Sequence, residues 1–184
     1  MKWVNTDYCE VIKCPEDFHL IGMGSTSVRN YILEWGRFHQ FDRVWMLDDN
    51  IKGYKRLHQG LKNDINSYEI FTSVEDYIDR YDNVGIVSHN FNPFITEGDC
   101  RGCLVKNGKS YSSMLIPTNN DIKFRYKHQE DNLISMEYIH KGYTTISFNH
   151  ILYDKDTSGQ NEGGNHKEIY KVNENNTDGD GYKE

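Results

Sequence analysis

Apolar residues along the chain fall into short runs with two different spacings, separated by polar turns. Alternating or continuous apolar runs are typical of strands, whereas apolar residues three or four positions apart are typical of helices. The strand-like runs lie at residues 8–14, 43–47, 83–90, 110–118 and 144–153. The helical runs lie at residues 28–39, 70–81 and 132–143.

The first strand, helix and strand in this order set the predicted fold class. Pro15 ends the run 8–14, and the next helix has its N-cap among Ser25, Thr26 and Ser27. Its apolar face is predicted to consist of Val28, Ile32, Trp35 and Phe38. A strand, a helix and a second strand in succession favour a parallel crossover. We therefore predict a single α/β domain with a mostly parallel central sheet flanked by helices.

The ends of the other two helices are indicated by capping residues. Thr72 or Ser73 is a candidate N-cap for the helix at 70–81. The helix at 132–143 is expected to end at Gly142, because glycine readily adopts the backbone conformation that terminates helices.

Length and composition limit the classes of protein that fit. A chain of 184 residues suits one domain, which we place at residues 1–170, followed by a polar tail at 171–184 that we expect to be disordered. No apolar run reaches the roughly 20 residues needed to span a bilayer. The start of the chain lacks the apolar stretch of a secretory signal, so we expect a cytoplasmic protein.

The net charge of -7 argues against a broad surface for nucleic acid, since phosphate contacts need clustered Lys and Arg. Two local basic groups are exceptions, and each is either a solvated face or a surface for a polyanion. The first group is Lys52, Lys55, Arg56, His58 and Lys62, and the second is Lys123, Arg125, Lys127 and His128.

The cysteines form two pairs, Cys9 with Cys14 and Cys100 with Cys103. Four thiolates that meet in space would bind zinc, whereas reduced, separate side chains are the simpler interpretation for an intracellular protein.

The most distinctive polar cluster is Asp48, Asp49 and Asn50, directly after an apolar strand that we expect to be buried on both faces. Ligands of open α/β sheets bind at the carboxyl ends of strands, and oxygen ligands suit Mg²⁺ or Mn²⁺. Turns are also rich in Asp and Asn, so a solvated turn is the alternative.

Two further motifs carry candidate chemistry. Asp131 and Glu130 precede the helix at 132, where Asp131 is either an N-cap or a general base. Gly163 and Gly164 would allow close approach of a ligand, and His166 could bind a metal; a flexible tail is the alternative.

The order of these pieces resembles a known family. It consists of "VRN" in a helix, a strand ending "LDDN", then "SYSSMLI", "FRYKHQEDNLISMEYIHKGY" and a Gly-Gly segment followed by a histidine. It resembles the glycosyltransferases of the GT-A fold, most closely the bacteriophage-type, TET-associated group thought to glycosylate hydroxymethylated bases in DNA. The resemblance covers about residues 8–170.

The resemblance implies a metal-dependent glycosyltransferase with a GT-A-like fold, a DxD-like motif, a nucleotide-sugar donor such as a UDP-sugar, and Mn²⁺ or Mg²⁺. It implies metal ligation by Asp48, Asn50 and His166. It also implies that the donor is bound by Arg29, Asp49, Gly163 and Gly164. Asp131 falls at the position of the catalytic base, and Glu130 would orient it or contact the acceptor. The implied acceptor is a hydroxymethylated base in phage DNA.

Two departures from the family pattern keep alternatives open. Asn50 replaces the usual third aspartate, which should weaken metal binding. Seven residues precede Tyr8, fewer than a strand and crossover helix for the donor's base require. The first alternative is a catalytically inactive GT-A-like module that binds nucleotide, nucleic acid or a protein partner; a homo-oligomer could also complete the site. The second is a metal-dependent phosphodiester hydrolase.

Overall fold

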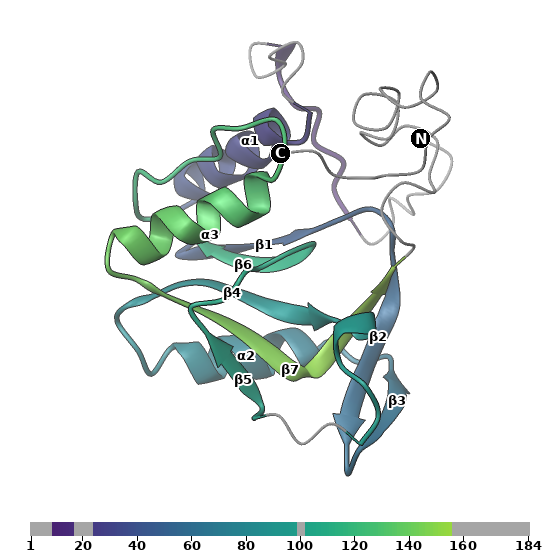
Figure 1. Ribbon diagram of the computed structural model, residues 1–184. Coiled ribbons are helices and arrows are strands. Elements are labelled where there is room, and N and C mark those ends of the chain that lie inside the picture. Colours follow the sequence, from purple (N-terminus) through teal and green to yellow (C-terminus); the bar gives the residue numbers. More distant parts are fainter. Residues whose placement is uncertain (1–8, 17–23, 99–101, 156–184) are drawn as a thin grey trace, which may run out of the picture.

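The computed structural model describes residues 9–16, 24–98 and 102–155. In this part of the chain, three α-helices and one short 3-10 helix pack around a seven-stranded sheet (Figure 1). The elements in chain order are α1 (Thr26–Phe38), β1 (Arg43–Leu47), β2 (Ile51–His58), β3 (Leu61–Ile65), α2 (Glu69–Ile78), β4 (Val84–Phe91), η2 (Asn92–Phe94), β5 (Leu104–Lys106), β6 (Ser113–Pro117), α3 (Glu130–His140) and β7 (Thr144–Lys155).

The sheet is mixed and mostly antiparallel. Its strands follow the order β1-β6-β4-β7-β2-β3, and β5 pairs with β7 beside this path. Among the described strand pairs, only β4 and β7 run parallel. The α/β class is therefore confirmed, and the prediction of a mostly parallel sheet is wrong. The GT-A-like arrangement stays a prediction from the resemblance.

The hairpin of β2 and β3 is one reason why the sheet is mostly antiparallel. Leu61 pairs with His58, so the hairpin turn consists of Gln59 and Gly60, both with positive φ of 51° and 78°. Two-residue turns of this kind join antiparallel neighbours without a crossover. The hairpin strands are rich in Lys, Arg and Asn, so their spacing did not predict strands. The spacing did not predict the short strand β5 either, because its three residues form no apolar pattern.

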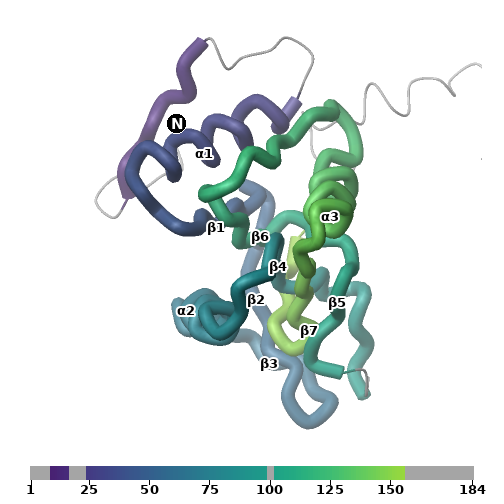
Figure 2. The backbone as a smooth tube through the Cα atoms, turned by 90° about the vertical axis from the view of Figure 1, so that its left-hand side faces the viewer, coloured from purple at the N-terminus to yellow at the C-terminus, as the bar shows by residue number. Residues whose placement is uncertain are grey.

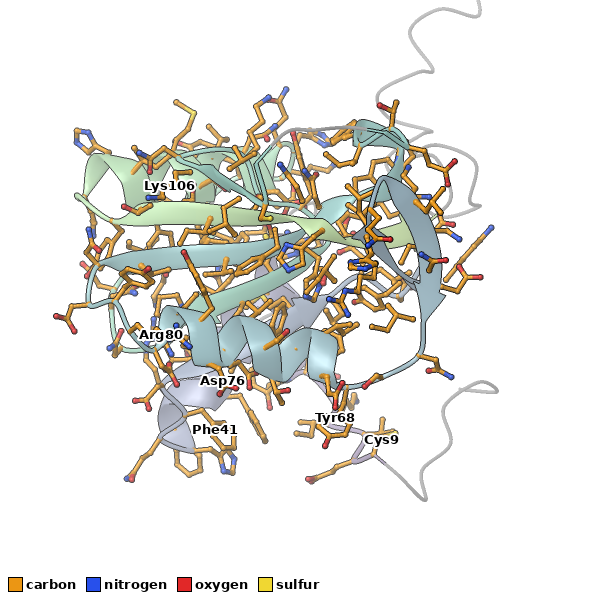
Figure 3. The ribbon with its side chains drawn as sticks, turned by 90° about the horizontal axis from the view of Figure 1, so that it is seen from below. Cys9, Phe41, Tyr68, Asp76, Arg80 and Lys106 are labelled. Atoms are coloured by element: carbon orange, nitrogen blue, oxygen red, sulfur yellow. The ribbon has the colours of Figure 1, made fainter. Side chains whose placement is uncertain are left out.

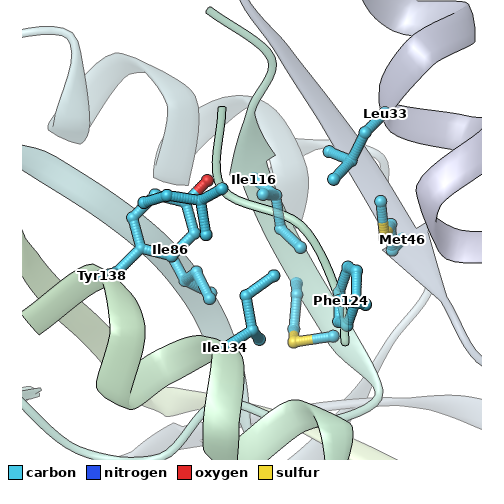
Figure 4. Packing of buried hydrophobic residues seen from close by; sticks show 9 residues of the cluster. Leu33, Met46, Ile86, Ile116, Phe124, Ile134 and Tyr138 are labelled. Carbon is cyan, nitrogen blue, oxygen red and sulfur yellow. The ribbon is translucent and has the colours of Figure 1, made fainter. Parts of the chain in front are cut away.

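The helices cover both faces of the sheet. Figure 2 shows α2 on one side and α3 on the other. On the α1 and α3 side, Leu33 and Ile134 pack in one cluster with Ile116 from β6 (Figure 4). The neighbouring Leu115 faces the other side, where it packs with Val74 of α2. Figure 3 looks at the α2 side of the sheet. Alternation along β6 therefore supplies both halves of the core.

The segment predicted as the first strand is not a strand. Residues 9–14 have no strand structure and are mostly exposed. Strand β1, predicted to be buried on both faces, instead lies at one end of the described sheet. Only Met46 of its five residues is fully buried, and Leu47 is 49% exposed. The parallel crossover between these two segments is therefore wrong.

Helix α1 forms where it is predicted, and its buried face matches the predicted one only in part: Ile32 packs against the core. Its buried residues are Thr26, Ser27, Arg29, Leu33 and Gly36. Val28 and Phe38, both predicted to be part of the apolar face, are 40% and 81% exposed. A Cβ on Gly36 would lie 2.7 Å from Cγ1 of Val44, so glycine at this position lets the helix approach the sheet closely. The close approach at Gly36 and the polar contacts of Arg29 therefore decide which residues of α1 are fully buried, more than the spacing of its apolar residues does.

The remaining predicted elements are present with shifted ends. Helix α2 begins at Glu69 after Tyr68, so the predicted caps Thr72 and Ser73 lie inside the helix. Helix α3 begins at Glu130, two residues before its predicted start. The strands β4, β6 and β7 overlap their predicted runs. The proposed boundary at residue 170 and the tail lie outside the described residues.

Candidate active site

Arg29, in the first turns of α1, lies at the centre of an acidic cluster. Its Nη2 donates to Oδ1 of Asp48 at 3.1 Å, and its Nη1 donates to Oδ1 of Asp131. The same Nη1 lies 3.8 Å from Oε1 of Glu130. The guanidinium carbon is 5.3 Å from the centre of the Phe124 ring. The Arg29 side chain is only 11% exposed, and a charge so far removed from water is stable because these anions surround it.

Three distant segments bring these charges together. Asp48 directly follows β1, at the turn into β2, and Glu130 and Asp131 lie in the first turn of α3. Helices α1 and α3 pack on the same face of the sheet, which places their first turns near this strand end (Figure 1). Carboxylates are favoured at a helix N-terminus because the backbone dipole is positive there. The fold therefore holds three carboxylates beside one arginine.

A second cation approaches Asp48 from the end of β7. Nζ of Lys155 lies 3.1 Å from Oδ2 of Asp48 and donates to Oγ of Ser112 at 2.5 Å. The backbone N–H of Asp48 donates to the carbonyl of Ser112 at 2.8 Å. Tyr153 is 1% exposed and hydrogen-bonds Ser112; burial raises the pKa of its hydroxyl, and the negative Asp48 raises it further. Each oxygen of the Asp48 carboxylate therefore contacts a different cation.

Asp131 is not the N-cap of α3. The helix begins at Glu130, and the residue before it, Gln129, has a left-handed backbone with φ of 56° and makes no side-chain capping bond. The Asp131 carboxylate contacts Arg29, while its backbone carbonyl accepts a bond from Oγ of Ser135 at 2.8 Å. The interpretation of Asp131 as a cap is therefore wrong, and its side chain belongs to the charged cluster.

Two of the predicted metal ligands, Asp48 and Asn50, lie within the described residues. Oδ1 of Asn50 is buried and has no hydrogen-bond partner among the described residues, an unusual state for an amide oxygen. Carboxylate and amide oxygens are hard ligands that suit Mg²⁺ or Mn²⁺. The described residues contain no group of three His, Cys, Asp or Glu side chains that could hold a metal. A cation here would therefore need phosphate or water ligands in addition.

The structure brings together four of the predicted site residues, namely Arg29, Asp48, Glu130 and Asp131. Asp49 is exposed and makes no contact with this cluster among the interactions of the described residues. Gly163, Gly164 and His166 lie outside the described residues.

Sequence reasoning missed Lys155 and the residues Ser112, Tyr153 and Ser25 of the same network. Oγ of Ser25 donates to Oε1 of Glu130 at 2.7 Å. Ser112 lies in the string "SYSSMLI" and Ser25 is a candidate N-cap, but neither pattern indicates a role in the site. The one available signal for Lys155 is its position at the polar end of an apolar strand.

The two basic groups have internal partners in the described structure. Lys55 contacts Asp64 at 2.5 Å, and Lys123 contacts Glu34 at 3.0 Å. Such contacts are typical of a solvated surface. Cys9, Cys14 and Cys103 form no disulfide bond within the described part of the chain, and Cys100 lies outside it.

Comparison with curated proteins and with solved structures found no match. Among the helices of the described residues, none is long and apolar enough to cross a membrane. A family model described as TET-Associated Glycosyltransferase matches residues 8–164, a range that contains every residue of the charged cluster. The chain therefore belongs to the TET-associated glycosyltransferase family, as the resemblance predicted.

Proposed function

We propose that the protein transfers a sugar from a nucleotide-sugar donor, a UDP-sugar, to an acceptor hydroxyl with the help of Mn²⁺ or Mg²⁺. The family name indicates glycosyltransferase activity. The observation that supports the finer proposal is the cluster in which Arg29 and Lys155 hold Asp48 beside Asp131. Such a site has cations for a diphosphate and a carboxylate for a hydroxyl proton.

The donor would bind through its diphosphate at the end of β1. Asp48 and Asn50 would hold the divalent cation, which when bound supplies positive charge to the diphosphate as it leaves. Arg29 would face the same phosphates, and its partial burial would strengthen that attraction because little water screens it. Asp49, Gly163, Gly164 and His166 belong to the proposed donor site through the resemblance alone.

Asp131 would act as the general base. Its ionised carboxylate can accept the proton of an acceptor hydroxyl as the hydroxyl oxygen attacks the sugar. The contact with Arg29 fixes the orientation of this carboxylate, and Ser135 fixes the backbone that carries it. Glu130, held by Ser25, would orient the acceptor.

We propose a hydroxymethylated DNA base as the acceptor, which would place the protein in the cytoplasm of a phage-infected cell. The resemblance supports this acceptor, and the net charge of -7 opposes extensive contact with duplex phosphates. A base displaced from the duplex, or single-stranded DNA, would need fewer such contacts.

One experiment tests the transfer. The protein is incubated with Mn²⁺ and a panel of nucleotide sugars, and released nucleoside diphosphate is measured with hydroxymethylated DNA, unmodified DNA or free hydroxymethylated nucleoside. We expect release with one donor, stimulated by hydroxymethylated DNA only. Stimulation by the nucleoside alone would replace the proposed acceptor, and no release with any donor and acceptor would contradict the proposal.

A catalytically inactive binding module is the second candidate. The observation that favours it is that Arg29 already contacts all three carboxylates, which is also how a structural ion cluster would look. This module would bind a nucleoside diphosphate, seen as a rise in the melting temperature, and release no product.

A further inference from the structure

The ammonium group of Lys155 lies beside Asp48, the carboxylate that we propose holds the divalent cation. Its Nζ is 3.1 Å from Oδ2 of Asp48, and Arg29 takes the other carboxylate oxygen at the same distance. The Lys155 side chain is 14% exposed. Because this lysine is the last residue of β7, its side chain stays near the site whether or not a ligand is bound.

The position of this ammonium is fixed by the surrounding backbone. Ser112 accepts the bond from Lys155 and is itself 2% exposed. Its φ of 47° is left-handed, which is uncommon for a residue with a side chain. In this conformation Ser112 binds Asp48 through its carbonyl and Lys155 through its hydroxyl. The aspartate and the lysine are therefore held together by a third residue, not by their mutual attraction alone.

We propose that Lys155 is a positioning residue that makes binding of the divalent cation depend on the donor's diphosphate. In the ligand-free protein its ammonium holds Asp48 and competes with the cation for the same oxygen. When a diphosphate is present, its oxygens give the ammonium new partners, and Asp48 becomes available to the cation. This proposal rests on the proposed function and adds a binding order to it.

The physical reason is repulsion between like charges that little water screens. A divalent cation and an ammonium group on the same carboxylate repel each other, and moving the ammonium away leaves it without an anion. A diphosphate removes both costs at once. Because such coupling is reciprocal, the cation must also strengthen diphosphate binding by the same factor.

The test measures Mn²⁺ binding to the full chain by titration calorimetry, with and without UDP. For the unaltered protein we expect UDP to tighten Mn²⁺ binding roughly tenfold or more, within the usual range of coupled sites. Lys155→Met keeps an unbranched side chain, shorter by one atom, and removes its charge. We expect this variant to bind Mn²⁺ alone roughly tenfold more tightly than the unaltered protein, with most of the effect of UDP lost.

Two control variants separate this effect from a general change in charge. Lys141 contacts Asp121 at 2.8 Å elsewhere on the molecule, so Lys141→Met should keep the coupling of the unaltered protein. Asp48→Asn should weaken Mn²⁺ binding in both the unaltered and the Lys155→Met backgrounds. Unfolding curves establish that each variant is folded.

The Mn²⁺ titration without UDP tests the competition even if the donor has been misassigned. If Lys155→Met binds Mn²⁺ no more tightly than the unaltered protein, Lys155 does not compete and the inference is wrong. If that variant binds more tightly while UDP binds no form of the protein, the competition stands and the proposed UDP-sugar donor is wrong. If UDP tightens Mn²⁺ binding equally in both proteins, the coupling does not pass through Lys155.

Discussion

At the scale of single residues, the candidate site centres on Asp48, whose two carboxylate oxygens contact different cations. Arg29 contacts Oδ1, and Lys155 contacts Oδ2. Arg29, Asp48 and Asp131 were identified from sequence through a family resemblance, because each lies in a recognisable string of residues. Lys155 lies outside these strings, and Ser112 lies in one of them, "SYSSMLI", which indicates no role for it. The contact between the two residues depends on β7 ending beside the loop before β6. Contacts that arise only from the meeting of distant segments leave no local trace in the sequence.

Asp131 is the residue whose change best separates catalysis from stability. Asp131→Asn keeps the shape and removes the negative charge, so we expect transfer to fall about 10²- to 10⁴-fold, the usual contribution of a general base. Binding of UDP with Mn²⁺ should change little, because Asp131 is not among the proposed donor ligands. The measurement is product formation at saturating donor, beside calorimetric binding of UDP. Unchanged transfer would assign Asp131 to the structure of the cluster only.

His89 gives a prediction at the same scale, outside the site. Its ring is 1% exposed, stacks on Trp45 at 5.0 Å between ring centres, and hydrogen-bonds Ser113 and the carbonyl of Ile70. Burial lowers the pKa of His89 to about 4, although the bond to Ile70 acts in the opposite direction.

The unfolded chain, with a histidine pKa of about 6.5, therefore binds a proton more readily than the native protein. The contribution of neutral His89 to the free energy of unfolding should be fully present above about pH 6.5. It should be lost as the pH drops towards about 4, which lowers the free energy of unfolding by up to roughly 3 kcal/mol. Urea unfolding across this range measures the slope. His89→Gln should flatten that slope; an equal slope in both proteins would show that other groups cause it.

At the scale of elements, the distance between α1 and the sheet depends on one small residue. Sequence spacing located this helix correctly but only part of its buried face. Ile32 packs against the core as predicted, whereas the fully buried positions include Thr26, Arg29 and Gly36. Hydrophobic periodicity assumes that buried positions are apolar, and this helix is placed partly by ionic contacts and close backbone approach. The hairpin of β2 and β3 was missed because its strands are polar and its turn is Gln-Gly.

Gly36→Ala tests this close packing. The added Cβ would lie 2.7 Å from Cγ1 of Val44 and 2.9 Å from Cγ2 of Thr118, so the helix must move. Overpacking of this kind costs about 1–3 kcal/mol, and the better helix propensity of alanine offsets up to about 1 kcal/mol. We expect a net loss of stability in urea unfolding. Gly53→Ala is the matched control, because a Cβ there would meet nothing within 4 Å; equal effects of both changes would contradict the packing argument.

At the scale of the whole molecule, one sheet carries helices on both faces, and the helices that supply the candidate site, α1 and α3, pack on the same face. The single α/β domain with helices on both faces was predictable from alternating patterns, whereas strand direction was not, because direction depends on which strands become neighbours. The match to the TET-associated glycosyltransferase family spans most of the chain, including both helices that supply the charged cluster. The fold thus gathers charges from α1, β1, α3 and β7 at one end of the sheet.

The place of β1 at the end of the described sheet has a consequence for its backbone amides. Asp48 donates its N–H to Ser112, and Asp42 accepts from the N–H of Thr118, so even-numbered residues of this strand bond to β6. In an antiparallel pair the residues between them direct their backbone groups outward, and no described strand pairs with them there. In heavy water, the amide protons of Trp45 and Leu47 should therefore exchange for deuterium sooner than those of Val44 and Met46. NMR would show this as exchange rates that alternate from one residue of β1 to the next.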